Sequence, residues 1–189
     1  CKAGTFQDVA GASACKTSPI GTYSLVGATQ YTSCPLGSYQ QYSGRSVCPL
    51  CPTGTLSTAA GGSSCTPCDA GFYNDKAGAS TCIVCPVGKA INSVGAEVCT
   101  PCAAGSIGPT IGLTECTECG AGKYASSGSA SCSTCIAGTF SAKSAGVCTS
   151  CPAGTISIAG TADKCTSCTT GKYQNLLGGT VCKIGRASC

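Results

Sequence analysis

Cysteine is the residue type in this chain that could carry chemistry, because 21 of the 189 residues are cysteines and none is histidine. Without histidine, Ser–His and Cys–His nucleophile pairs are excluded. Most cysteines fall in Cys-x2-Cys pairs, and 12 or 13 residues separate one pair from the next. This spacing is typical of two chemistries, disulfide bonds and zinc modules with four thiolate ligands.

The cysteines mark a period of 16 or 17 residues that fills nearly the whole chain. A fixed short period predicts an array of small repeats, each touching mainly its neighbours. We predict tandem repeats over residues 1–182, followed by a truncated or terminal segment over 183–189. Repeats one to eleven begin at residues 1, 18, 34, 51, 68, 85, 102, 119, 135, 151 and 168, and the first residue of each is position zero.

Counting the cysteines that are left over distinguishes the two chemistries. Closure of each repeat on itself uses twenty cysteines and leaves Cys189, whereas four zinc sites built from eight Cys-x2-Cys pairs use sixteen and leave five. Repeat two has lost its first and last cysteines together, to Ser18 and Tyr31, as a direct bond between them predicts. Joint loss is compatible with zinc too, but it leaves Cys15 and Cys34 stranded. We therefore favour disulfides, and we expect no metal and no cofactor.

The predicted disulfides are Cys1–Cys15, Cys34–Cys48, Cys51–Cys65, Cys68–Cys82, Cys85–Cys99, Cys102–Cys116, Cys119–Cys132, Cys135–Cys148, Cys151–Cys165 and Cys168–Cys182. In the chain-entropy model each such loop is stabilised by about 3 kcal/mol. Repeat two, with Ser18 and Tyr31 in place of cysteines, is the predicted weak point or hinge. Cys189 is predicted to be an unpaired thiol or to form an intermolecular bond.

Two recurring glycines and one recurring apolar residue predict the turns and the short strand that position the cysteines of each repeat. Position three is glycine in every repeat, which predicts a positive φ or a close backbone approach, and a second glycine further on predicts a turn. Position five is large and apolar in ten repeats, which predicts a short strand and a ladder of side chains packed on neighbouring cystines. These residues are Phe6, Tyr23, Tyr39, Leu56, Tyr73, Ile107, Tyr124, Phe140, Ile156 and Tyr173.

The predicted fold class is small, disulfide-rich and all-β. Glycine or proline interrupts every short stretch, and no stretch has helical periodicity, so we expect no helices. With three Phe and no Trp or Met, the hydrophobic core is small and cross-links must make up the difference. We expect an elongated linear array of about eleven units that resemble β-hairpins.

The repeat resembles the ephrin-receptor-like cysteine-rich repeats of the growth-factor-receptor cysteine-rich superfamily, most clearly at residues 34–39, 51–55 and 151–155. A single repeat also resembles the one-disulfide module that opens tumour necrosis factor receptor ectodomains. The resemblance implies extracellular, rod-like stacks of small β modules. Long runs of such repeats are similar to those in surface and filament proteins of protists and algae, including mastigoneme components.

Composition excludes several classes of function. The net charge of +4 is scattered and forms no basic stripe for nucleic acid, and no apolar run could span a membrane. The acidic residues are dispersed, and Glu115 with Glu118 is better explained as a solvated face than as a cation site. No sequon for N-glycosylation occurs, but exposed hydroxyls predict O-glycosylation. The candidate threonines are Thr5, Thr22, Thr55, Thr139 and Thr155.

The sequence therefore predicts an extracellular, secreted or cell-surface structural protein that forms part of a rod or filament, with no enzymatic activity. Near-identical repeats with little charge suit self-association into a fibre. The alternative is a segment of a ligand-binding or adhesive receptor ectodomain. Receptors of that type carry exposed aromatic and arginine hot spots, and this chain has only Arg45 and Arg186.

Overall fold

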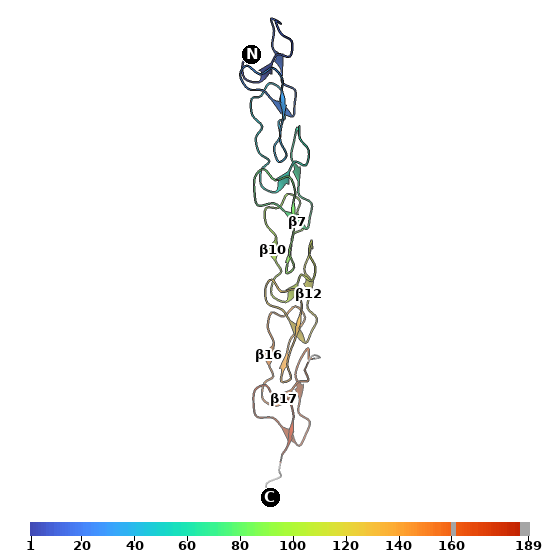
Figure 1. Ribbon diagram of the computed structural model, residues 1–189. Helices are drawn as coiled ribbons and strands as arrows, with labels where there is room; N and C mark the ends of the chain where they lie inside the picture. The colour runs from blue at the N-terminus through green and yellow to red at the C-terminus, as the bar shows by residue number, and fades with distance from the viewer. Residues whose placement is uncertain (160–161, 186–189) are drawn as a thin grey trace. The chain divides into compact units, whose positions relative to one another are not determined.

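The computed structural model describes residues 1–159 and 162–185 (Figure 1). In these ranges there is no helix, and the regular structure consists of two-residue strands in antiparallel pairs. The predicted small, disulfide-rich, all-β fold class is confirmed. Contacts within the chain divide it into an N-terminal unit, Cys1–Cys85 with Ile91–Cys99, and a C-terminal unit, Pro86–Ala90 with Thr100–Cys189.

In the N-terminal unit, each strand at positions four and five pairs with the last two residues of the same repeat, which follow the position of its second cysteine. Thr22 of repeat two, for example, lies opposite Ser33, and Tyr23 lies opposite Thr32. The pairs are β1 (Thr5–Phe6) with β2 (Lys16–Thr17), β3 (Thr22–Tyr23) with β4 (Thr32–Ser33), β5 (Thr55–Leu56) with β6 (Thr66–Pro67), and β7 (Phe72–Tyr73) with β8 (Ile83–Val84).

The C-terminal unit repeats this register. The pairs are β9 (Lys89–Ala90) with β10 (Thr100–Pro101), β11 (Ser106–Ile107) with β12 (Thr117–Glu118), β13 (Lys123–Tyr124) with β14 (Ser133–Thr134), β15 (Thr139–Phe140) with β16 (Thr149–Ser150), β17 (Thr155–Ile156) with β18 (Thr166–Ser167), and β19 (Lys172–Tyr173) with β20 (Lys183–Ile184).

Repeat three forms a single bridge, Ser38 with Leu50, in place of a strand pair. The Tyr39 N–H donates to the Pro49 carbonyl at 3.0 Å. Proline has no N–H to return, so the second bond of the ladder cannot form. The other repeats place proline at the second residue of the strand, as in Pro67 and Pro101, or use none.

Backbone hydrogen bonds join each repeat to the next. In the N-terminal unit, the Gly54 N–H donates to the Asn74 carbonyl at 2.7 Å, and the Cys68 N–H donates to the Gly54 carbonyl at 2.9 Å. The turn of repeat five adds a further bond to repeat four, since the Gly78 N–H donates to the Cys51 carbonyl at 2.8 Å. The C-terminal unit has the same bonds, for example between Gly138 and Ser157. Within each unit, the repeats are therefore bonded in chain order through the backbone.

The position-three glycines also contact the repeat after next, which the sequence alone does not predict. Gly54 has a φ of +75°, and a Cβ atom built on it would lie 2.1 Å from the Gly95 carbonyl oxygen. Gly138 has the same relation to Gly178 in the C-terminal unit, also at 2.1 Å. Both predicted reasons for glycine therefore apply here, a positive φ and a close approach of backbone. Within each unit, a turn such as that of Gly95 or Gly178 therefore packs against the two repeats that precede it.

The core consists of cysteines and small polar residues. The first cysteine of most repeats is at most 1% exposed, as at Cys51 and Cys119. Position six is buried as well and is polar in most repeats, for example Ser24, Asn74 and Ser141. The position-five side chains are less buried than these residues, and their packing as a ladder on neighbouring cystines stays a prediction. Phe6 is buried, Tyr173 is 47% exposed, and the remaining eight are half-buried.

Candidate functional site

The site that the fold builds is a series of cystines, one for each repeat except repeat two. Ten disulfides join the two cysteines of a repeat, with Cα–Cα distances of 5.6–5.8 Å. They use the sulfur atoms that four-cysteine zinc sites would have needed. The ten bonds are Cys1–Cys15, Cys34–Cys48, Cys51–Cys65, Cys68–Cys82, Cys85–Cys99, Cys102–Cys116, Cys119–Cys132, Cys135–Cys148, Cys151–Cys165 and Cys168–Cys182.

The two cysteines of a repeat differ in exposure. In repeat four, Cys51 is buried and Cys65 is half-buried, and this asymmetry recurs in most repeats. The first cysteine is covered because its N–H donates to the glycine of the preceding repeat and its carbonyl accepts from the next turn. Repeat one is different, since Cys1 and Cys15 are both exposed. In most repeats the cystine therefore joins a buried junction to a loop that faces solvent.

Position six braces this loop, and sequence reasoning did not single it out. In repeat three, the Gln40 side-chain amide donates to the Val47 carbonyl at 2.8 Å, next to Cys48, and its oxygen accepts from the Tyr42 N–H at 3.1 Å. Gln174 makes the same two bonds in repeat eleven, to Val181 and Leu176. The signal was available, because polar residues recur at one position directly after the apolar one.

Repeat two replaces its cystine with two other contacts. Ser18 is fully buried, and its hydroxyl donates to the Ser24 hydroxyl, with the two oxygen atoms 2.6 Å apart. At the other end of the missing bond, the Tyr31 ring packs edge-on against Phe6, with centroids 5.3 Å apart. The β3–β4 pair is intact. Repeat two thus keeps the fold of its neighbours, and its role as a hinge stays a prediction about dynamics.

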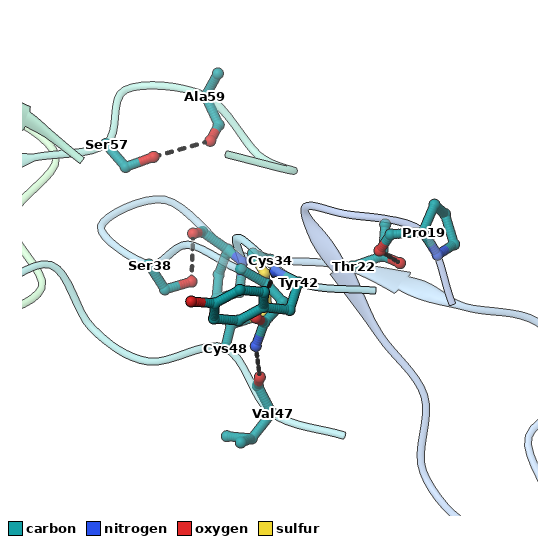
Figure 2. The surroundings of a disulfide bond; sticks show 11 residues. Pro19, Thr22, Cys34, Ser38, Tyr42, Val47, Cys48, Ser57 and Ala59 are labelled. Carbon is teal, nitrogen blue, oxygen red and sulfur yellow. Dashed lines mark hydrogen bonds between the residues drawn. A yellow bond between two sulfur atoms is a disulfide. The ribbon is translucent and has the colours of Figure 1, made fainter. Parts of the chain in front are cut away.

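The threonines proposed for O-glycosylation have a structural contact. In each of Thr5, Thr22, Thr55, Thr139 and Thr155, the hydroxyl donates to the carbonyl three residues earlier, at 2.7–2.8 Å. Figure 2 shows the bond from Thr22 to Pro19. Ser38 and Ser106 make the same bond at 2.8 Å. A glycan on oxygen would remove the donated proton, so this geometry favours a role in closing the turn.

Two exposed ion pairs lie on the described surface. The Lys16 ammonium is 2.8 Å from Asp8, and this hydrogen bond lowers the pKa of the Asp8 carboxyl. Lys143 lies 2.6 Å from Glu118. Hydrogen bonds from Lys143 and Ser144 lower the pKa of Glu118, while the bond to Glu118 raises the pKa of Lys143. Glu118 therefore pairs across two repeats, whereas Glu115 is exposed and apart from that pair.

The remaining predictions concern residues and spans outside these contacts. Cys189 and Arg186 lie outside the described residues. In the described part of the chain, no helix is long and apolar enough to cross a membrane.

Stacked, cystine-closed β modules of this kind define a tandem cysteine-rich repeat protein. A family model described as tyrosine-protein kinase ephrin type A/B receptor-like matches residues 21–64 and 54–98. The resemblance to ephrin-receptor-like cysteine-rich repeats is therefore confirmed. No curated protein matches the chain. Because disulfides persist in oxidising compartments, the cystines and this family together indicate an extracellular or cell-surface location. Folds of this kind are typical of proteins without enzymatic activity.

Proposed function

We propose that this chain is a tension-resisting segment of an extracellular structural protein that assembles into rods or fibres. The observation that carries the proposal is the double linkage of the cystine-closed repeats within each unit, for example repeat four. Its own loop is closed by a cystine, and its backbone is bonded to the next repeat and packed against the one after, as at Gly54, Asn74 and Gly95. A chain linked in this way resists extension at each doubly linked repeat, which a protein that only presents a binding surface does not need.

The surface composition supports self-association. Only 10% of the residues are charged. Large aliphatic side chains are exposed along both units, for example Val26 at 77%, Ile136 at 72% and Leu177 at 76%. Apolar surface with little charge favours lateral packing of copies over monomeric solubility. O-glycans on exposed hydroxyls would moderate this packing, and mass measurement of intact peptides tests for them.

Electron microscopy of native material, with and without reductant, tests the structural role. We expect fibres in which this chain is a component, and we expect them to disperse when the cystines are reduced. A chain with Cys51→Ala and Cys65→Ala serves as the matched variant, since it loses one cystine and keeps nine. Native material that consists of dispersed monomers under all conditions would overturn the proposal.

A second candidate is a ligand-binding ectodomain, and one observation favours it. Tyr31 and Tyr42 are 46% and 55% exposed, and the Arg45 guanidinium lies 5.3 Å from the centre of the Tyr42 ring. Tyrosine and arginine are the residue types that dominate binding hot spots. If the native protein is monomeric, binding to cells that is lost in Tyr42→Ala and retained in Val94→Ala would support this candidate.

A further inference from the structure

A groove lies at the junction of repeats four and five in the N-terminal unit. Its volume is about 420 Å³, and its floor includes the Cys68–Cys82 cystine. Leu56 and Thr66 of repeat four contribute one side, while Asp69, Phe72 and Ser80 of repeat five contribute the other. None of the residues that line this groove belongs to the two ion pairs.

The groove combines an apolar surface with a polar rim. Phe72 is 38% exposed, and Leu56 and Pro67 extend the apolar part. The polar residues of its lining are Thr58, Thr66, Ser80, Thr81 and Asp69. Asp69 is exposed and has no ion pair among the described residues, so its carboxylate is available to an incoming ligand.

We propose that this groove binds one ring of a neutral polysaccharide. A sugar ring has an apolar C–H face, which fits against Phe72, and a set of hydroxyls, which can donate to the Asp69 carboxylate and exchange bonds with Thr66 and Ser80. The only charge in the lining is negative. Anionic glycans and nucleic acid are therefore disfavoured by repulsion.

The chain contains a natural control for this site. The junction of repeats ten and eleven has a groove of about 360 Å³ at the equivalent position, lined by Ile156 and Thr166. There Thr169 occupies the place of Asp69, and Lys172 occupies the place of Phe72. This second groove has neither the aromatic ring nor the carboxylate, so we expect it not to bind the same sugar.

Amide NMR titration of the full chain with a panel of neutral tetrasaccharides of glucose, mannose, xylose and galactose tests the proposal. We expect saturable shifts over residues 56–82 with at least one member, and none over residues 156–182. Asp69→Asn is expected to weaken this binding by about tenfold, the usual effect of losing a charge-assisted hydrogen bond. Lys172→Ala is the control and should leave affinity unchanged.

Phe72→Ala is expected to weaken binding by a similar factor, and Phe72→Leu keeps the apolar volume if the alanine variant does not fold. The proposal is overturned if no member of the panel gives saturable shifts, if both grooves respond equally, or if Asp69→Asn and Phe72→Leu bind as tightly as the parent. The titration uses dispersed chain and does not depend on fibre formation. Failure here therefore leaves the structural role standing, and the absence of fibres leaves the sugar site standing.

Discussion

Repeats two and four have the same backbone fold but different means of closing it. Both have an antiparallel strand pair with the same register. Both also place their position-three glycine against a carbonyl two repeats ahead, which would lie 2.1 Å from a Cβ atom added at Gly21 or at Gly54. Repeat four is closed by Cys51–Cys65, whereas repeat two relies on a serine pair and an aromatic pair. The glycines and the backbone bonds therefore specify the path of the chain, and the cystine stabilises a path already specified.

We expect the largest effect from replacing the position-three glycine, which is Gly21 in repeat two and Gly54 in repeat four. In Gly54→Ala the new methyl group collides with the Gly95 carbonyl and the residue has a positive φ, so we expect a loss of about 3 kcal/mol or more. Gly21→Ala should do equal damage in repeat two. Hydrogen-exchange protection of repeats two to six measures the effect by position.

Gly27→Ala is the matched control for these variants. Gly27 has a φ of +75°, but nothing lies within 4 Å of a Cβ atom built there. The substitution therefore adds backbone strain alone, about 1–2 kcal/mol. Equal losses at Gly27 and Gly54 would show that the contact with the repeat after next contributes nothing, and our account of the shared path would be wrong.

The next variants replace the cystine of repeat four, first with alanines and then with the serine and tyrosine that repeat two has at these positions. Cys51→Ala with Cys65→Ala should cost repeat four about 3 kcal/mol, since a 14-residue loop is released. Cys51→Ser with Cys65→Tyr should recover part of this. The serine can bond Ser57, which corresponds to Ser24, for about 1 kcal/mol, and the tyrosine can pack on Tyr39, for about 0.5–1.5 kcal/mol.

Protection of the amide hydrogens in repeat four reads out both double variants in parallel. If the serine–tyrosine variant is no better protected than the alanine variant, the contacts of Ser18 and Tyr31 do not compensate for the lost cystine. In that case repeat two should also exchange faster than repeats three to five in the parent chain, as expected of a hinge.

The cysteine spacing and the invariant glycine were enough to predict the all-β class and the position of the strands. Three features could not be predicted from the cysteine spacing and this glycine. Gly4 contacts Gly44, two repeats away, and a 17-residue period contains no information on which distant repeat a glycine meets. The burial of position six arises because its carbonyl accepts from the preceding repeat and its N–H donates to the following one, as at Asn74, which draws the side chain inward.

The third feature concerns the turn of repeat nine, in which the second glycine, the residue type that we expect at the turn, is Gly146. The structure instead gives Ser144 the positive φ, +60°, and the Ser144 N–H donates to the Cys119 carbonyl at 2.9 Å. Repeat nine has one residue fewer within its loop than repeat four, 13 against 14 in sequence separation. Repeat eight is equally short, but there Gly128 has the positive φ, nine residues after the first cysteine. Ser144 takes that position in repeat nine, and Gly146 lies two residues beyond it.

Ser144→Gly should have a smaller effect, and it tests how much the backbone conformation of a turn contributes to the stability of a repeat. Relief of the left-handed conformation should stabilise repeat nine by about 1 kcal/mol. Ala142→Gly in the same turn has no such strain to relieve and should destabilise by about 0.4–1 kcal/mol through the unfolded chain. Local hydrogen exchange measures both. Parallel changes in the two variants would mean that the φ of Ser144 carries no cost.

Acidification should have the smallest effect and should spare both repeats of the comparison, because neither contains an ion pair among the described residues. Asp8 and Glu118 have lowered pKa values, so their pairs stabilise the fold above the ordinary carboxyl range, and this contribution is lost as pH falls through the folded pKa. The Lys143 pKa is raised, so its part is retained until the solution is strongly basic. Protection factors measured at pH 7 and pH 3 should therefore fall slightly in repeats one, seven and nine. Lys143→Ala should reduce the change at Glu118 and leave the part due to Ser144. A comparable fall in repeats two and four would mean that unpaired groups control the response.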